Sequence, residues 1–281
     1  MPGKLIIFWD YDTQWGADRS RSPGGPKGWG HLEFENTERL LELHAAYSLP
    51  ACFAVVGAAA LPGSRPYHDP DQIRCIDRMG HEIASHSMYH DWLPGLGYSR
   101  LLRTLKESKD ALEQCIGKAV ISFVPPFNQP FDYWKKGSLS ISERREAAAG
   151  RIDLLRLMDA LSETGYLFSR VSYLSLLERL VMLLFKKELD RPEVPEKIGQ
   201  ITCLRLNTPG GFKQKTMEMV ERSGRDGNYT LVFAHPHSLH RGDAQDEKFY
   251  IPFLRRVKQL VDSGSVEVVL PRQLVESNGL A

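Results

Sequence analysis

Segments with the pattern of buried β-strands alternate with helical segments along this chain, and this alternation restricts the fold more than any other feature of the sequence. The strand-like segments are residues 4–9, 51–56, 81–84, 120–124, 201–206, 229–234 and 266–270. The helical segments are residues 37–47, 69–79, 99–116, 152–164, 172–187, 213–222, 246–262 and 272–276. Strands alternating with helices are typical of a mostly parallel sheet, either open or closed into a barrel. The sequence has no internal repeat and no shift in composition, so we expect one domain over residues 1–281.

Some segment boundaries carry specific signals. Asp69 and Pro70 are typical of an N-cap and a first helical residue, and Gly117 is typical of the residue that ends a helix. Residues 13–30 are rich in Gly, Pro and Arg, and we expect them to form a loop after the first strand.

The charge balance argues against a strongly basic nucleic-acid-binding protein, because 36 basic and 35 acidic side chains give a formal net charge of +1. The cluster of Arg255, Arg256 and Lys258 is accordingly interpreted as a solvated helix face. Apolar residues make up 42% of the chain and charged residues 25%, which is typical of a globular protein and excludes disorder as the main state.

The hydropathy pattern predicts no transmembrane segment, since no apolar run approaches the roughly 18 residues that a membrane span needs. The apolar run at residues 5–9 is too short for the core of a signal peptide, so we expect a cytoplasmic protein. The four cysteines form no CxxC pair, and we interpret them as buried thiols rather than as disulfides or a zinc site.

Polar side chains follow three of the predicted strands, and the carboxyl ends of parallel strands are where catalytic residues gather. Asp10 and Asp12 follow the first strand and share a face, although aspartates are also common in plain turns. His86 and His90 follow the 81–84 strand; on one face of a helical turn they could chelate a metal, and the alternative is two surface histidines. His235 ends the 229–234 strand, where a buried core histidine is the alternative.

Taken together, these residues predict a catalytic metal centre. Two histidines and one carboxylate supply three protein ligands and leave positions open for water and substrate. A second carboxylate can act as general base and a separate histidine as general acid. This combination indicates metal-assisted hydrolysis of an amide or an ester. His31, His44 and His81 are assigned structural roles.

The segments FWDYD, GHEIASHSMYH and LVFAHPH, in this order, resemble the polysaccharide deacetylase superfamily, which is carbohydrate esterase family four. ERLLELHAAYSLPACFAVVG and LKESKDALEQCIGKAVISFVPPFN are also similar to segments of that family. The resemblance runs from about Leu5 to Leu274 and is weakest between Gly137 and Gln200. It implies a distorted (β/α) barrel with mostly parallel strands, and an enzyme that removes N- or O-acyl groups, mostly from amino sugars.

The resemblance also implies roles for individual residues. Asp10 matches the general base and His235 the general acid. The family's three ligands of a divalent metal, expected to be zinc, are matched by Asp12, His86 and His90. The backbone N–H of Phe127 matches the group that helps to form the oxyanion hole.

The third motif departs from the family. It usually reads Arg-x-Pro-Tyr, and its arginine orients the general base, but here it reads Val124-Pro125-Pro126-Phe127. A cation from another part of the chain would have to replace that arginine, and the candidates are Arg19, Arg21 and Lys135. The alternative is a protein that binds carbohydrate without hydrolysing it.

Several side chains are candidates for binding the substrate. Trp15 follows the metal ligand and could stack on a sugar ring, or simply pack as part of a surface loop. Asn128 and Trp134 belong to a polar and aromatic cluster after the third motif that is typical of a sugar-binding rim. His237, close to the general acid, could also touch the substrate.

The expected function is hydrolysis of a linear amide bond that removes an acetyl or formyl group from an amino sugar. A cytoplasmic enzyme would meet a nucleotide-linked or lipid-linked saccharide, as in surface-polysaccharide or O-antigen biosynthesis. This substrate assignment rests on the expected location and on the family resemblance. One alternative is hydrolysis of a non-sugar C–N bond, as in allantoinase-like relatives, and another is the catalytically silent carbohydrate-binding protein.

Overall fold

The computed structural model describes residues 1–20, 29–128, 154–172 and 194–278. Within these ranges the chain forms one nine-stranded sheet in the order β6-β7-β5-β4-β3-β2-β1-β8, and β9 pairs with the start of β1. All pairs are parallel except β6 with β7. The strands are β1 (Gly3–Tyr11), β2 (Cys52–Val55), β3 (Glu82–Ser85), β4 (Ser122–Phe123), β5 (Phe168–Val171), β6 (Glu196–Ile198), β7 (Ile201–Arg205), β8 (Tyr229–Ala234) and β9 (Val266–Val268).

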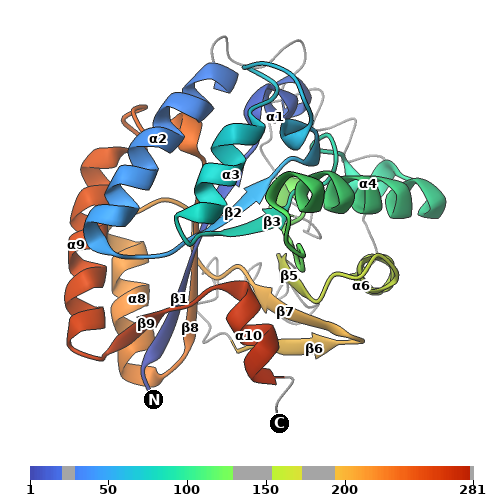
Figure 1. Ribbon diagram of the computed structural model, residues 1–281. Coiled ribbons are helices and arrows are strands. Elements are labelled where there is room, and N and C mark those ends of the chain that lie inside the picture. Colours follow the sequence, from blue (N-terminus) through green and yellow to red (C-terminus); the bar gives the residue numbers. More distant parts are fainter. Residues whose placement is uncertain (21–28, 129–153, 173–193, 279–281) are drawn as a thin grey trace, which may run out of the picture.

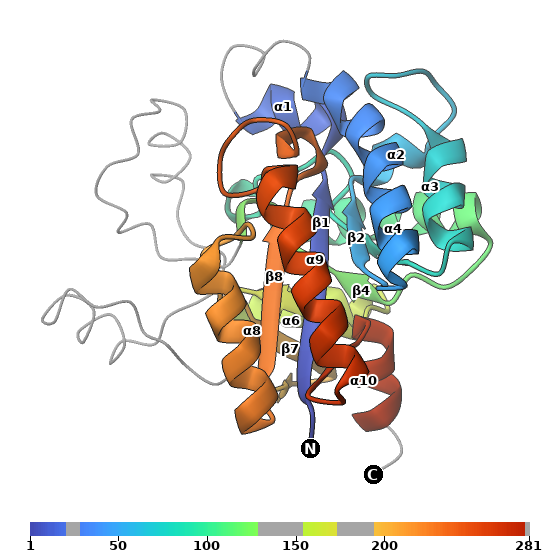
Figure 2. The same cartoon turned by 90° about the vertical axis from the view of Figure 1, so that its left-hand side faces the viewer.

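Helices cover the outer face of this sheet (Figures 1 and 2). The α-helices of the described ranges are α1 (Thr13–Ser20), α2 (Trp29–Tyr47), α3 (Pro70–Arg78), α4 (Tyr98–Ile116), α6 (Leu154–Glu163), α8 (Gln214–Asp226), α9 (Glu247–Asp262) and α10 (Pro271–Asn278). The N-terminus and α10 lie at one end of the molecule, and α1 lies at the opposite end, where β1 finishes (Figures 1 and 2).

Side chains alternate between the two faces of a strand, and β1 therefore contributes to two apolar layers. Leu5, Ile7 and Trp9 belong to the large cluster that packs the sheet against the surrounding helices. Ile6 and Phe8 belong to a smaller cluster on the inner face of the sheet. All five side chains are fully buried, so β1 is the central strand of the core.

The sheet is strongly curled. Three strands separate β1 from β5, which in a flat sheet would place these two strands about 19 Å apart, at about 4.8 Å per step. The rings of Phe8 on β1 and Phe168 on β5 nevertheless have centroids only 6.5 Å apart. α10 closes one end of the inner layer, because Leu274 joins the inner cluster and the Arg272 N–H donates to Glu82 Oε2 at 2.9 Å. This curled half-barrel confirms the predicted fold class of a distorted (β/α) barrel.

Most of the predicted elements are confirmed, and their end signals act as expected. The Asp69 carboxylate accepts from the N–H of Gln72 at the start of α3, and Gly117 ends α4 in the left-handed conformation at φ 70°. The segment 173–187 of one predicted helix lies outside the described residues.

The structure corrects the sequence-based prediction in three places. Residues 13–20 form α1 rather than a loop, and α2 begins at Trp29, eight residues before the predicted start at residue 37. Gly16 allows α1 to begin directly at the end of β1, because a Cβ at this position would lie 2.4 Å from the Cβ of Asp12. Third, the structure contains β5 and β6, which were not predicted. These strands have four and three residues, too few to show the alternation of polar and apolar residues that marks a strand.

None of the helices in the described ranges is both long enough and apolar enough to cross a lipid bilayer.

Candidate metal centre and active site

Asp12, His86 and His90 converge on one point at the carboxyl ends of the central strands. Asp12 directly follows β1, and His86 directly follows β3. The Nε2 atoms of His86 and His90 lie 3.3 and 3.6 Å from Asp12 Oδ1, and all three side chains are buried. One ligand atom from each residue lies within 4.8 Å of the other two, which is close enough to hold one metal ion.

The two histidines meet because the chain turns after β3, and the predicted helical turn is wrong. Ser87 and His90 both have left-handed backbone conformations, at φ 61° and 57°. The Ser87 hydroxyl accepts from the N–H of Asp91 at 2.8 Å, and the Asp91 carboxylate accepts from the Thr104 hydroxyl at 2.6 Å. This hydrogen-bonded turn fixes His90 opposite His86 without a helix.

The three side chains of Asp12, His86 and His90 present lone pairs that suit a cation. His86 Nδ1 lies 2.7 Å from the carbonyl oxygen of Val124, and since a carbonyl can only accept, Nδ1 carries the proton and Nε2 presents its lone pair toward Asp12. Asp12 Oδ1 is buried and has no hydrogen-bond donor in the described part of the chain. Burial opposes the charge of Asp12, but His90 and His86 hold its pKa below its ordinary value. A buried carboxylate oxygen facing two imidazole nitrogens is typical of a site for a divalent metal.

Asp10 lies on the inner face of the sheet, within β1, and is paired with an arginine from the other side of the curl. Arg170 on β5 donates from its two terminal nitrogens to the two carboxylate oxygens of Asp10, at 2.9 and 2.6 Å. Both side chains are at least 95% buried. Burial alone raises the pKa of Asp10, but Arg170, assisted by His86 and His235, holds it below its ordinary value.

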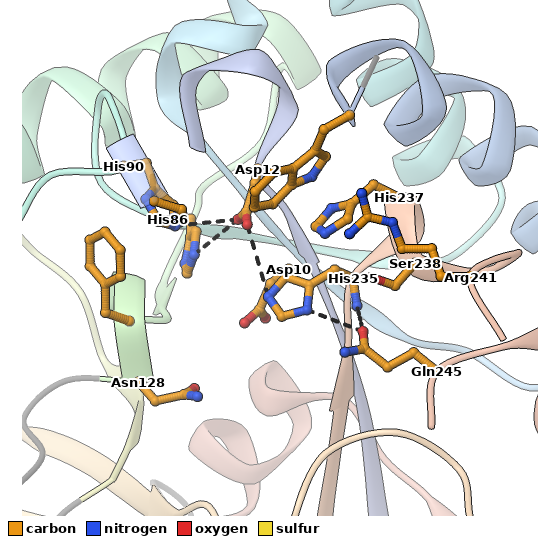
Figure 3. A pocket seen from close by; sticks show the side chains of 13 residues that line it. Asp10, Asp12, His86, His90, Asn128, His235, His237, Ser238, Arg241 and Gln245 are labelled. Atoms are coloured by element: carbon orange, nitrogen blue, oxygen red, sulfur yellow. Dashed lines mark hydrogen bonds and ion pairs between the residues drawn. The ribbon is translucent and has the colours of Figure 1, made fainter. Parts of the chain in front are cut away.

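His235 follows β8 and reaches the same site from the opposite side (Figure 3). Its Nε2 lies 3.9 Å from Asp12 Oδ2. The Gln245 side-chain oxygen accepts from the backbone N–H of His235 at 2.6 Å and lies 3.2 Å from its Nδ1. The ring is 26% exposed, which leaves it accessible from the pocket.

Phe127 follows β4 in a strained backbone conformation, at φ 59° and ψ 25°. Its ring lies edge-on to His90, with the centroids 4.5 Å apart. The next residue, Asn128, is also left-handed at φ 52°, and its side-chain oxygen accepts from Arg170 at 3.0 Å. Both residues therefore border the metal centre.

A pocket of about 300 Å³ joins these groups (Figure 3). Its lining comprises Asp10, Asp12, Ser20, Trp29, His86, His90, Phe127, Asn128, His235, His237, Ser238, Arg241 and Gln245. The pocket therefore has one wall that carries the metal ligands and another wall formed around His237.

The wall around His237 is supported from behind by a buried carboxyl group. His237 Nδ1 lies 2.8 Å from Glu33 Oε2, which also accepts from Trp29 Nε1 at 3.2 Å. The rings of Trp29 and His237 are in contact, with centroids 3.9 Å apart. Burial and the charge of Asp12 raise the pKa of Glu33 well above its ordinary value, and burial lowers the pKa of His237 to about 2.

The remaining residues that the sequence suggested for binding substrate or for pairing with Asp10 are only partly in the pocket. Asn128 and His237 line the pocket, but Trp15 packs against Tyr67, His68 and Tyr89 instead. Arg19 pairs with Asp91 at 3.0 Å and contacts Tyr89, so it does not supply the cation for Asp10. Trp134, Arg21 and Lys135 lie outside the described residues.

The sequence reasoning missed Arg170, Glu33, Trp29 and Gln245. Arg170 lies on a four-residue strand that was not predicted, although the alternation of elements requires a strand after the helix that Gly165 ends. Glu33 and Trp29 lie in the first turns of α2, which the predicted helix omitted.

Comparisons with known proteins link part of this chain to one family. Residues 27–139 match the model of the polysaccharide deacetylase family. A curated chitooligosaccharide deacetylase from Sinorhizobium fredii is 28% identical over 113 residues, which cover 40% of this chain and 48% of the relative, so the chain matches about half of that protein's length.

Solved structures extend the likeness to the whole fold. A putative polysaccharide deacetylase from Mycobacterium smegmatis has a TM-score of 0.62 at 18% identity, covering 98% of this chain and 89% of that one. An allantoinase has a TM-score of 0.53 at 14% identity, covering 97% and 89%. The family match, the curated relative and the shared fold thus confirm the resemblance found in the sequence: residues 27–139 are similar to the polysaccharide deacetylase family, and the fold is similar to that of a solved structure described as a polysaccharide deacetylase.

Proposed function

We propose that this protein is a metal-dependent hydrolase that removes an N-acyl group, acetyl or formyl, from an amino sugar. The observation that carries the proposal is the convergence of Asp12, His86 and His90 in one pocket with a second carboxylate, Asp10, and a third histidine, His235. Carbohydrate deacetylation is the activity of the family whose model the chain matches. The curated relative is a chitooligosaccharide deacetylase, which supports an oligosaccharide substrate.

Asp12, His86 and His90 would hold the metal, for which we propose zinc because a set of two histidines and one carboxylate suits it. When bound, such an ion supplies Lewis-acid polarisation of an acyl carbonyl and lowers the pKa of water. Asp10, buried and hydrogen-bonded to Arg170, takes the proton from the attacking water. The Phe127 N–H stabilises the oxyanion, and His235, positioned by Gln245, protonates the leaving nitrogen.

The substrate side of the proposal rests on the other wall of the pocket. Asn128 and His237 offer polar groups to sugar hydroxyls, and Trp29 and His237 form a rigid ring surface. We propose a nucleotide-linked or lipid-linked amino sugar of the cytoplasm, as in surface-polysaccharide or O-antigen assembly. The four cysteines are free thiols, which suits a reducing compartment.

The proposal is tested by measuring metal content and acyl release on the same preparations. Wild-type protein purified without chelator is expected to carry about one zinc per chain and to release acetate or formate from a panel of N-acyl amino sugars. His86→Ala is expected to lose both properties. The matched control is His240→Ala, which removes a histidine that is 56% exposed and should change neither.

The same panel discriminates between the alternatives. Release from cyclic ureides but not from N-acyl sugars would favour an allantoinase-like hydrolase, whose fold this chain shares. Sugar binding without acyl release by zinc-loaded protein would favour a carbohydrate-binding protein. Absence of metal from wild-type protein even after reconstitution would overturn the proposed centre.

A further inference from the structure

Arg170 stands at the level of the sheet where the family's third motif would place its arginine, but one strand away. β4 and β5 are parallel neighbours in which Ser122 pairs with Phe168 and Phe123 with Ser169. Continuing this register by one residue brings Val124 level with Arg170. Side chains at equivalent positions of neighbouring strands share a face, so a guanidinium on β5 points into the same interior as one on β4 would.

The side chain of Arg170 is held by three hydrogen bonds and two aromatic rings. It donates to both oxygens of Asp10 and also to the Asn128 side-chain oxygen. Its guanidinium carbon lies 5.0 Å from the ring centroid of Phe8 and 5.1 Å from that of Phe233. Two parallel hydrogen bonds fix the plane of a carboxylate, and flanking rings restrict rotation of the guanidinium.

We propose that Arg170 is the positioning residue of this active site: it aims Asp10 and, through Asn128, fixes the backbone that carries the Phe127 N–H. The inference rests on the proposed function and deepens it. Each carboxylate oxygen has a second lone pair, so Asp10 can accept from Arg170 and still take a proton from water. One side chain from β5 thus sets the relative positions of the base on β1 and the oxyanion donor after β4.

The first arm of the test measures turnover. With an amino sugar that the wild-type protein hydrolyses, Arg170→Ala is expected to lower kcat by about 10² to 10³, with KM and zinc content changed little. Arg170→Lys keeps a cation but cannot bond both oxygens in one plane, so its kcat should be intermediate. Ser169→Ala is the matched control on the same strand and should keep wild-type turnover.

Chemical rescue separates positioning from a merely structural role. Millimolar guanidinium is expected to restore part of the lost kcat in Arg170→Ala, while methylammonium restores less, because only guanidinium reproduces the planar pair of donors. A kcat in Arg170→Ala within about threefold of wild type would overturn the proposal. A loss of kcat that guanidinium cannot restore in folded, zinc-loaded protein would also overturn it.

The second arm does not depend on substrate. A double-mutant cycle of Arg170→Ala and Asp10→Asn in urea unfolding is expected to be non-additive, with the Arg170 change costing less once Asp10 is neutral. Additive effects would overturn the proposal. If wild-type protein hydrolyses no sugar but the cycle is non-additive, the proposed function fails while the pairing of Arg170 with Asp10 stands.

Discussion

His86 Nδ1 donates to the carbonyl oxygen of Val124 at 2.7 Å, so the residue that stands in place of the family's arginine orients a candidate metal ligand through its backbone. This hydrogen bond fixes the tautomer of His86 and directs Nε2 toward Asp12. The bond uses a main-chain oxygen and so does not depend on the side chain at position 124. The third motif can therefore lose its arginine without disturbing the ligands.

Asp10→Asn is expected to lower turnover by about 10² to 10⁴ while zinc content stays at the wild-type level, because Asp10 is the candidate base and none of the three ligands. Steady-state kinetics and elemental analysis on one preparation check this. The control is Asp18→Asn, which changes an exposed carboxylate on α1. Full activity in Asp10→Asn would show that the base is a different residue.

Glu33→Ala should raise KM several-fold with kcat and zinc content nearly unchanged. The substitution removes the partner of His237 Nδ1 and of Trp29 Nε1, and one such hydrogen bond is worth about 0.5–1.5 kcal/mol. Initial rates over a range of substrate concentrations measure the effect, and Glu35→Ala, an exposed residue of the same helix, is the control. An unchanged KM would mean that this wall does not contact the substrate.

Gly16→Ala is expected to weaken zinc binding at least tenfold and to destabilise the fold by about 1–3 kcal/mol. The added Cβ would lie 2.4 Å from the Cβ of Asp12, so the ligand or α1 has to move. Gly97→Ala is the control, because a Cβ there meets nothing within 4 Å. Competition with a chelating dye gives the zinc affinity, and equal affinities in the two variants would contradict the prediction.

Stability should fall as the pH drops below about 6.5, with His44 as one of the causes. Burial, followed by the charge of His81, lowers the pKa of His44 from 6.5 to about 3. Between pH 6.5 and about 3, a proton therefore binds His44 in the unfolded chain but not in the folded one. The contribution of His44 to the free energy of unfolding is complete above pH 6.5 and is lost as the pH falls toward 3. The slope from one such group is at most about 1.4 kcal/mol per pH unit.

Urea denaturation at a series of pH values measures this slope, and His44→Gln should make it shallower. Glutamine does not titrate, and its side chain can still accept from Trp9 Nε1, as His44 Nε2 does at 3.0 Å. His31→Gln, an exposed histidine of the same helix, is the control and should leave the slope unchanged. The prediction is wrong if both variants follow the wild-type curve.

The sequence was sufficient for the fold class because alternation and end signals are local. Asp69 caps its helix through an N–H only three residues away, and the 229–234 strand is observed with its predicted bounds. The candidate ligands were also found locally, since Asp12 and His86 directly follow strands and His90 lies four residues after His86.

The supporting residues could not be found in this way, because their partners are remote in sequence. Arg170 lies 160 residues from Asp10, on a strand with only four residues and two polar side chains. Glu33 lies 204 residues from His237 and falls in a helix start that the preceding Gly- and Pro-rich segment obscures. Only the curl of the sheet brings such pairs together.

Val124 and Arg170 lie side by side on neighbouring strands, and this affects how such domains are compared. In the sequence alone, position 124 of the third motif holds valine, and no nearby residue points to the arginine at position 170. In three dimensions Arg170 lies level with Val124 on the neighbouring strand, about 4.8 Å away, and its guanidinium pairs with Asp10. A motif read along one strand therefore overlooks this cation, whereas the side chains that fill one layer of the barrel interior include it.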